Sequence, residues 1–392
     1  MTSPRFSILI PTRDRVETFV HTLKTVVDQP GDDFEIVVAD NASRPGIREA
    51  VDAVSSCPIR YVRSDTILSM DANWEYGLEA CTGEFVTVLG DDDAFVPSTL
   101  EAVRRILKAS QAKLLSWGTH TYWWPDTIVE WNRNTLYVEY GHDVSWMDSR
   151  KVLVGFMNGT VTFGTLPMLY NAFAHRSLLD AIKQKHGRYF SIPNSPDLVS
   201  GVLLLTLTDR YAHSKRPLSV RGNSGRSMGS AYWCRSRGAE VRKAGHQQGG
   251  VPSLDKVVHP SLIPSPNLQI LLASSRLWFQ DLLFAGDKEL AVDTSRLVDT
   301  IVSTLNFEPE AYDDNLADAR ALAAKQGRTI DSSKIPPRQP RARYRPRGPI
   351  TDNDGKLAIM AVDGDLARLQ NVHDAAWLAE SLMPLLDTYM AP

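Results

Sequence analysis

The sequence predicts an α/β fold in which helices flank a central sheet, followed by a mainly helical C-terminal extension. Over the first hundred residues, short apolar runs typical of buried strands alternate with segments of helical periodicity. Strands separated by helices pair in parallel through right-handed crossovers, which predicts a doubly wound sheet. Near residue 235 the character of the sequence shifts, while helical periodicity continues beyond it.

The elements follow from the spacing of apolar residues. Apolar runs predict strands at 6–10, 34–39, 59–62, 85–89 and 114–119. Apolar residues three and four apart predict helices at 16–27, 47–54, 72–81, 100–107, 151–157, 176–185, 197–207, 268–284 and 290–305. The polar, glycine-rich stretch 238–252 predicts a loop or boundary, and 357–390 predicts one or two amphipathic helices.

Composition indicates an ordinary globular protein. The chain has 392 residues, with 43% hydrophobic and 23% charged residues, which allows two or three domains. The net charge of −3 gives no electrostatic argument for nucleic-acid or membrane binding. Three scattered cysteines form no zinc or disulfide pattern and suggest a reducing compartment. The apolar run 6–10 is too short for a signal peptide, and no run approaches the ~20 residues of a membrane span. We therefore expect a cytoplasmic protein without a transmembrane segment.

Eight tryptophans and tyrosines crowd between Trp117 and Trp146. Aromatic side chains at this density either line a sugar-binding cleft or form a satellite core. The core interpretation is favoured for most of them.

The most informative stretch is the acidic run Asp91-Asp92-Asp93, which follows the predicted strand 85–89. Ligands bind at strand ends in open α/β sheets, and adjacent carboxylates repel one another unless a cation neutralises them. A divalent ion held by one or two carboxylates is a common way to hold a diphosphate. The alternative is a solvated turn whose last Asp caps the next helix. No glycine-rich fingerprint follows the first strand, which disfavours a dinucleotide-binding dehydrogenase or a P-loop NTPase.

Motifs in a fixed order accompany this acidic run. They are SILIPTR at 7–13, EIVVADNAS at 35–43, NW at 73–74 with ACTGEF at 80–85, and GDDD at 90–93. Together they resemble family 2 glycosyltransferases, which are inverting enzymes of the GT-A fold, a Rossmann-like mixed sheet flanked by helices. The resemblance is strong over 5–110, weaker to about 235 and absent beyond. It implies transfer from a nucleotide-diphosphate sugar, with UDP favoured, to an acceptor hydroxyl, assisted by Mn²⁺ or Mg²⁺.

The resemblance also assigns roles to residues. Asp93 and Asp92 are expected near the metal, Asp91 and Asp92 near the nucleotide, and Asp40 against the base, where a carboxylate can accept the imide N–H of uracil. The remaining nucleotide-binding candidates are Pro11, Thr12, Arg13, Asn41 and Asn73. The family's Asp-x-Asp-Asp pattern is replaced here by Gly90-Asp91-Asp92-Asp93, which leaves open which Asp takes which role.

An inverting displacement needs a base that takes the proton of the acceptor hydroxyl. The family places an acid for this at a helix start about a hundred residues after the metal motif, and Asp197 stands there. Pro196 replaces the acidic residue that many members have before it, and an ordinary helix start is the alternative. Arg226 and Ser227 follow where the family closes a segment over the nucleotide, so they are candidate phosphate or lid residues. A plain surface loop is as good an interpretation of that segment.

We therefore expect a glycosyltransferase domain over 1–235, with a nucleotide-sugar half (1–110) and an acceptor half (111–235). A helical extension (236–330), a Pro/Arg-rich linker (331–351) and a C-terminal helical segment (352–392) would follow. The linker's arginines are also compatible with peripheral contact to an anionic membrane, and the sequence leaves self-association open.

Two other functions stay open from the sequence. A sugar-phosphate nucleotidyltransferase would share the fold type and the metal, but its expected N-terminal glycine-rich signature with basic residues is missing. A non-catalytic nucleotide-sugar-binding protein would have lost its acids, whereas Asp91–Asp93 and Asp197 are intact.

Overall fold

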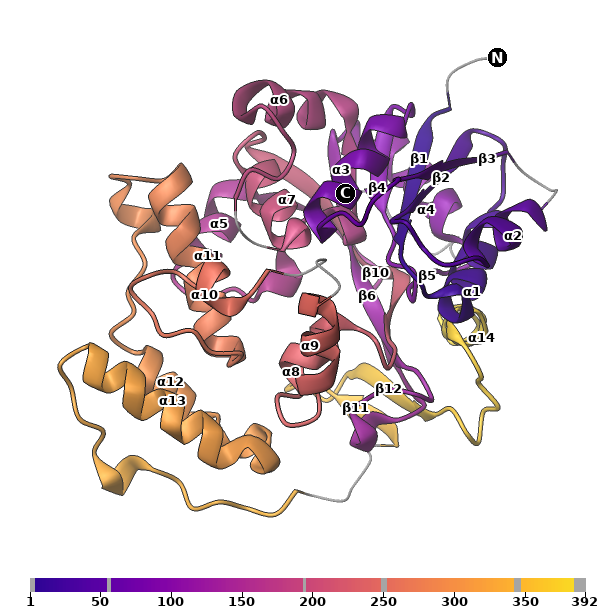
Figure 1. Ribbon diagram of the computed structural model, residues 1–392. Helices are drawn as coiled ribbons and strands as arrows, with labels where there is room; N and C mark the ends of the chain where they lie inside the picture. The colour runs from indigo at the N-terminus through magenta and orange to yellow at the C-terminus, as the bar shows by residue number, and fades with distance from the viewer. Residues whose placement is uncertain (1–3, 55–57, 193–194, 248–251, 342–346, 384–392) are drawn as a thin grey trace.

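The computed structural model describes residues 4–54, 58–192, 195–247, 252–341 and 347–383 (Figure 1). Its strands are β1 (Phe6–Thr12), β2 (Phe34–Asp40), β3 (Ile59–Arg63), β4 (Phe85–Val88), β5 (Ala94–Phe95), β6 (Leu114–Trp123), β7 (Thr135–Glu139), β8 (Val144–Asp148), β9 (Ala172–His175), β10 (Arg210–Asn223), β11 (Gly348–Thr351) and β12 (Leu357–Asp363). Its α-helices are α1 (Val16–Val27), α2 (Ile47–Asp52), α3 (Met70–Ala80), α4 (Thr99–Ser110), α5 (Ser149–Met157), α6 (Arg176–His186), α7 (Pro196–Leu205), α8 (Met228–Trp233), α9 (Ala239–Gln247), α10 (Leu254–Val257), α11 (Leu268–Leu283), α12 (Leu297–Ser303), α13 (Tyr312–Lys325) and α14 (Val372–Ser381).

The strands form one mixed sheet in the order β11-β12-β7-β6-β9-β4-β1-β2-β3, and β10 pairs with β5, β6 and β8. The first four strands are parallel, as their helical crossovers predict. β9 lies antiparallel between β4 and β6, which makes the sheet mixed. The mixed sheet flanked by helices and the helical region after residue 235 confirm the expected fold class.

Alternation along the central strands explains the two helical layers. On β1, Leu9 belongs to the core beneath α3, α5 and α7, whereas Ile8 and Ile10 belong to the core beneath α1 and α4. Strands buried on both faces read as continuous apolar runs, and this is why the sequence predicted them well. The crowded aromatics are largely core, as favoured above, because Trp117, Tyr122 and Trp124 are all buried.

Strand register aligns the residues that matter for the site. Thr12 at the end of β1 is paired with Asp40 at the end of β2, and Asp40 is paired with Arg63 at the end of β3. Because these strands are parallel, the three side chains lie at the same edge of the sheet.

The extension after residue 235 differs from the prediction at two places. The stretch predicted as a loop at 238–252 contains the helix α9, and residues 248–251 of that prediction lie outside the described residues. The predicted helix 290–305 is shortened to α12 with a 3₁₀ turn on either side. Helices α10 to α13 enclose a small core of their own, which includes Ile270, Ile301 and Leu322.

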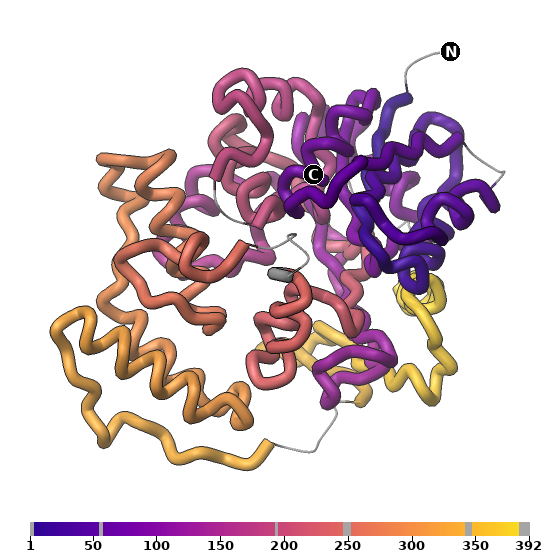
Figure 2. The backbone as a smooth tube through the Cα atoms, viewed as in Figure 1, coloured from indigo at the N-terminus to yellow at the C-terminus, as the bar shows by residue number. Residues whose placement is uncertain are grey.

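The C-terminal segment corrects a larger error, because 352–392 is not only helical. Residues Leu357–Asp363 form β12, which pairs antiparallel with β7, and β11 pairs with β12, so the chain's last part extends the central sheet. The strand was missed because its partner lies far away in sequence, and an apolar run of this length fits either element. The following helix α14 packs against α1, and the tube view shows the yellow C-terminal part beside the indigo N-terminal part (Figure 2).

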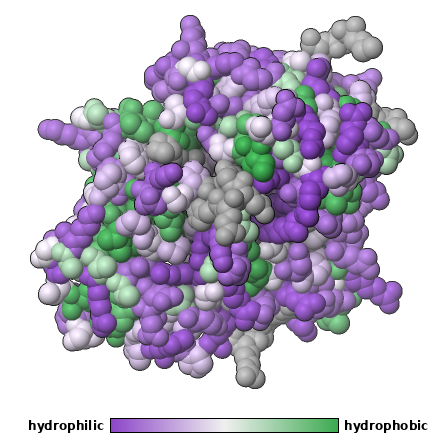
Figure 3. Space-filling view, in the orientation of Figure 1, coloured by the Kyte–Doolittle hydropathy of each residue, from purple (hydrophilic) through white to green (hydrophobic). Residues whose placement is uncertain are grey.

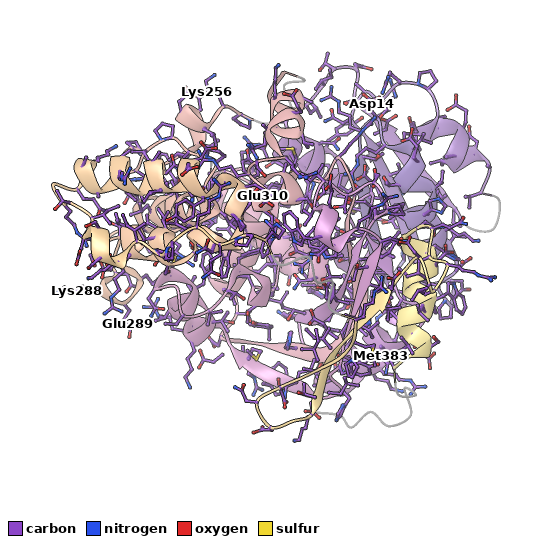
Figure 4. The ribbon with its side chains drawn as sticks, turned by 90° about the horizontal axis from the view of Figure 1, so that it is seen from below. Asp14, Lys256, Lys288, Glu289, Glu310 and Met383 are labelled. Carbon is purple, nitrogen blue, oxygen red and sulfur yellow. The ribbon has the colours of Figure 1, made fainter. Side chains whose placement is uncertain are left out.

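The arginine–proline stretch is likewise more than a linker, because β11 forms its end. Arg338 pairs with Asp313 at 3.1 Å, Arg341 pairs with Glu310 at 2.7 Å, and Arg347 pairs with Asp363. Arg343 and Arg345 lie outside the described residues. Figure 4 shows Glu310 near the middle of the molecule and Lys288 and Glu289 at the outer end of the helical extension. Since three arginines are already neutralised by this chain's acids, they give little support to an anionic-membrane contact.

The surface adds no stronger membrane signal. Within the described ranges, no helix is both long and apolar enough to cross a membrane. On the face drawn in Figure 3, most of the surface is hydrophilic and the hydrophobic residues form separate small groups.

Candidate active site

The acidic turn that follows β4 is held by the first β–α connection. The Thr12 hydroxyl donates to Asp91 Oδ2 at 2.7 Å, and the backbone N–H of Arg13 also donates to Asp91. Arg15, just before α1, contacts Asp91 Oδ1 and Asp92 Oδ2, each at 2.7 Å. Burial raises the pKa of Asp91, and the Arg15 guanidinium opposes that rise. Arg15 therefore pairs with two of the three clustered carboxylates and offsets one of their two negative charges; the sequence did not point to it, although it stands two residues after Arg13.

Asp93 is in a different situation. Its Oδ1 accepts from the Gly222 N–H at 2.7 Å and its Oδ2 accepts from the Gly90 N–H at 3.2 Å. Burial and the neighbouring Asp92 charge raise the pKa of Asp93. Among the residues that the structure describes, no Lys or Arg lies close enough to Asp93 to form an ion pair. The Arg221 charge opposes the rise without forming such a pair, so Asp93 is the acid of the three that could accept a divalent cation.

Asp92, the second predicted metal ligand, is bound more strongly by other side chains than Asp93 is. Its Oδ2 accepts from the Ser224 hydroxyl at 2.7 Å as well as from Arg15. Across the described ranges, no group of three or more His, Cys, Asp or Glu side chains is arranged to hold a metal. A cation at Asp93 would therefore need further oxygen ligands from a bound molecule such as a diphosphate, as is usual for Mg²⁺.

The predicted lid residues lie on the loop after β10. Arg226 donates to the Asp14 carbonyl at 2.6 Å, so this loop already touches the connection between β1 and α1, where Figure 4 labels Asp14. Ser227 accepts from the Ser230 N–H and caps α8. Residues 210–223 form a 14-residue strand, so only the few residues after Asn223 form the loop.

Asp40, which is expected to contact the nucleobase, already accepts hydrogen bonds from other residues of the protein. Its Oδ1 accepts from the Ser43 N–H at 2.9 Å, and its Oδ2 accepts from the Tyr61 hydroxyl and from Arg63 Nη1, the latter at 2.6 Å. The Asp40 side chain is only 1% exposed. Asp40 thus lies at the predicted sheet edge, but its hydrogen-bonding capacity is largely used within the protein.

The two asparagines have different surroundings. Asn41 exchanges two hydrogen bonds with the backbone of Leu68 and thereby fixes the segment between β3 and α3. Asn73 donates to the Ala39 carbonyl at 3.3 Å, and its buried side-chain oxygen has no partner within the described residues. Asn41 is therefore a structural residue in this arrangement, while Asn73 keeps an unused acceptor. Pro11 lies beside them in β1, paired with Ala39.

Asp197 lies in the first turn of α7, where its carboxylate accepts from the Ser195 hydroxyl and from the Leu198 N–H at 2.9 Å. Burial raises the pKa of Asp197, which is a property of carboxylates that act as bases. Burial also raises the pKa of Tyr170 to about 12, with the Arg221, Asp197 and Asp93 charges acting on the same hydroxyl. Asp93, the predicted metal ligand, and Asp197, the predicted general base, thus both lie within electrostatic range of Tyr170. No sequence signal pointed to Tyr170 or Arg221.

Comparison with known proteins supports the resemblance. Residues 7–159 match the family model described as Glycosyl transferase family 2. The abequosyltransferase RfbV of Salmonella typhimurium is 31% identical over 113 residues, which cover 28% of this chain and 34% of that protein. A GalNAc(5)-diNAcBac-PP-undecaprenol beta-1,3-glucosyltransferase of Campylobacter jejuni is 27% identical over 103 residues, covering 26% and 33%. The chain thus spans about a third of the length of these relatives. Among solved structures, Staphylococcus aureus TarS 1–349 with UDP-GlcNAc aligns over 82% of this chain and 87% of that chain, at 16% identity and a TM-score of 0.47.

Proposed function

We propose that the protein, whose residues 7–159 match the Glycosyl transferase family 2 model, transfers a sugar from a nucleotide-diphosphate donor to an acceptor hydroxyl, with inversion at the anomeric carbon. The observation that supports the proposal is that Asp93, after β4, and Asp197, at the start of α7, are separate acids whose pKa values are both raised by burial. A cation-binding acid and a separate base are the two groups that a metal-assisted single displacement needs.

The donor would lie along the carboxyl ends of β1, β2 and β4. Asp93 would bind Mn²⁺ or Mg²⁺, with Asp92 beside it, and Thr12 and Asp91 would border the ribose. The bound cation would supply positive charge to the diphosphate as the bond to the sugar breaks. Arg15 keeps Asp91 and Asp92 in place, so the turn is rigid before the donor arrives.

Asp197 would act on the acceptor. Its raised pKa makes the carboxylate a stronger base than an exposed aspartate, so it can take the hydroxyl proton as the oxygen attacks. Ser195 and the Leu198 N–H hold one carboxylate oxygen, which orients the group. A single base on the face opposite the leaving group permits one displacement and therefore one inversion.

The test uses the full chain and a panel of nucleotide sugars. Thermal-shift measurements with each donor, with and without Mn²⁺ or Mg²⁺, should identify a donor whose stabilisation depends on the cation. A ligand at 100 times its dissociation constant stabilises by about 2.7 kcal/mol, which a melting curve resolves. The product formed with that donor should carry the inverted anomeric configuration, which proton NMR coupling reports.

Other outcomes of these measurements would contradict the proposal or favour a different function. A retained configuration would contradict the single displacement and the role of Asp197. Cation-dependent binding with no transfer or hydrolysis would favour a non-catalytic binding protein, and pyrophosphate release from a nucleoside triphosphate and a sugar phosphate would favour a nucleotidyltransferase.

A further inference from the structure

The ion pair between Asp40 and Arg63 determines which groups of a nucleobase this end of the candidate site can recognise. Arg63 ends β3 directly beside Asp40, and its Nη1 donates to Asp40 Oδ2 at 2.6 Å. The Tyr61 hydroxyl and the Ser43 N–H also donate to Asp40. With its side chain 1% exposed, Asp40 presents almost no acceptor surface to a ligand.

Arg63 has the opposite character. Its side chain is 44% exposed, although Nη1 is held by Asp40 and Nη2 donates to the Ser43 carbonyl at 2.6 Å. A guanidinium has five N–H donors and no acceptor, so the contacts with Asp40 and the Ser43 carbonyl, together with a hydrogen bond to the Tyr61 hydroxyl, leave two donors. These contacts also fix its plane, which reduces the entropy lost when a ligand binds. The sheet edge therefore presents a rigid donor where an open acceptor was expected.

The spacing of the strands places Arg63 at the right end of the site. Neighbouring strands lie about 4.8 Å apart, so the three steps from β4 through β1 and β2 to β3 span about 14 Å. Asp91 is fastened to Thr12 at one end of this span, and Arg63 lies at the other end. An extended nucleoside diphosphate laid along these strand ends, with its phosphates at the acidic turn, has its base near Arg63.

We propose that Arg63, held in place by Asp40, reads a carbonyl edge of the donor's nucleobase, and that Asp40 is a positioning residue and not the acceptor of a base N–H. This inference rests on the proposed function. Guanine offers O6 and N7, and uracil offers carbonyl oxygens, as acceptors for such a donor. Adenine and cytosine carry an amino group at the corresponding position, which meets Arg63 donor against donor.

The experiment measures the binding of UDP, GDP, ADP and CDP to the full chain with Mn²⁺ by calorimetry. UDP or GDP should bind at least about tenfold more tightly than ADP and CDP, a difference of 1.4 kcal/mol. Arg63→Met keeps an unbranched stem but removes all the donors, so this preference should fall to within about threefold. Arg60→Met is the matched control, because Arg60 lies on the same strand, is half exposed and pairs with Glu35, so the preference should be unchanged.

A second arm needs no variant and decides between Arg63 and Asp40 even if Arg63→Met does not fold. Methylation of the ring N–H, in N3-methyl-UDP or N1-methyl-GDP, removes the donor that Asp40 would accept but keeps the carbonyl oxygens. Binding of the methylated form of the preferred nucleotide within about fivefold of the parent supports the proposal. Loss of binding on methylation, or a preference for ADP or CDP, overturns it while leaving the proposed function intact. If none of the nucleotides binds, both the inference and the proposed function are wrong.

Discussion

The backbone nitrogen of Gly222 lies 2.7 Å from Oδ1 of Asp93, and this hydrogen bond fastens β10 to the acidic turn. The approach is so close that a Cβ on Gly222 would stand 1.7 Å from the carbonyl oxygen of Asp92. Glycine is needed here because of contact with the turn and not because of its own backbone angle. The geometry of the acidic turn thus depends on a strand that is more than a hundred residues away in sequence.

Gly222→Ala should displace the acidic turn. A shift of about 1 Å at a reacting group can reduce the rate by about 10²-fold, so we expect a loss of that order in turnover together with a lower melting temperature. Gly229→Ala is the matched control, because an added Cβ there meets only the Ser227 hydroxyl at 3.8 Å. Wild-type turnover in Gly222→Ala would show that the turn tolerates movement.

Asp93→Asn should reduce activity strongly and change stability little. The Asp93 carboxylate is buried without a direct ion pair, so removal of its charge should offset the loss of one backbone hydrogen bond, from Gly90 or Gly222, and the melting temperature should change little. Turnover should fall by about 10²–10³-fold, the scale of a lost transition-state contact, and stimulation by Mn²⁺ should disappear. Asp92→Asn should instead lower the melting temperature, because it weakens the contacts with Arg15 and Ser224. Melting curves and a Mn²⁺ titration of both variants check this pair.

Asp197 should determine the acidic limb of the rate–pH profile. A base is active only when deprotonated, and burial raises the pKa of Asp197, so turnover should begin to fall at a higher pH than an ordinary aspartate dictates. Ser195→Ala removes a hydrogen bond that stabilises the carboxylate, which should raise the pKa of Asp197 further and move the limb to still higher pH.

Asp197→Asn should lower turnover by about 10²–10⁴-fold and abolish the limb, while donor affinity stays close to normal. Asp180→Asn, an exposed acid on α6, is the control and should behave as wild type. An unchanged pH profile in Asp197→Asn would remove the assignment.

The ion pair between Arg216 and Glu380 should make α14 essential for the catalytic domain. Arg216 Nη2 contacts Glu380 Oε1 at 3.0 Å, and the Arg216 side chain is 1% exposed. Removal of one partner of a buried pair costs about 3–5 kcal/mol, so Glu380→Ala should lower the free energy of unfolding by that amount in urea titrations. Asp52→Ala breaks the exposed pair with Arg48 and should leave the free energy of unfolding nearly unchanged. An equal effect of the two substitutions would show that α14 is dispensable.

Local patterns predicted the parts of the fold that depend on local sequence. Apart from the two-residue β5, the strands and helices up to α4 agree with their apolar spacing, because each central strand is buried on both faces and each helix covers one face. The strands β5 and β7 to β12 were not predicted, since they owe their stability to partners elsewhere in the chain.

The candidate site likewise contains residues that local motifs predict and residues that only the fold brings together. Asp91–Asp93 and Asp197 stand in motifs and were named in advance. Arg15, Arg63, Tyr170 and Arg221 were not named, because only the folded chain brings them to the acids. The engagement of Asp40 by Tyr61 and Arg63 could not be read from its motif either, since it depends on the register between β2 and β3.

The pairing of β12 with β7 has a consequence for how the protein is made. About 200 residues separate the two strands, and a ribosome adds about 5–20 residues per second, so the edge of β7 waits about 10–40 s for its partner. During this time the nascent chain exposes an open strand edge and the apolar surface that α14 later covers, including Ala94 and Val96. Protection of this surface by a chaperone during translation, or aggregation when synthesis stops early, is the expected consequence of pairing β7 with a strand that is made so much later.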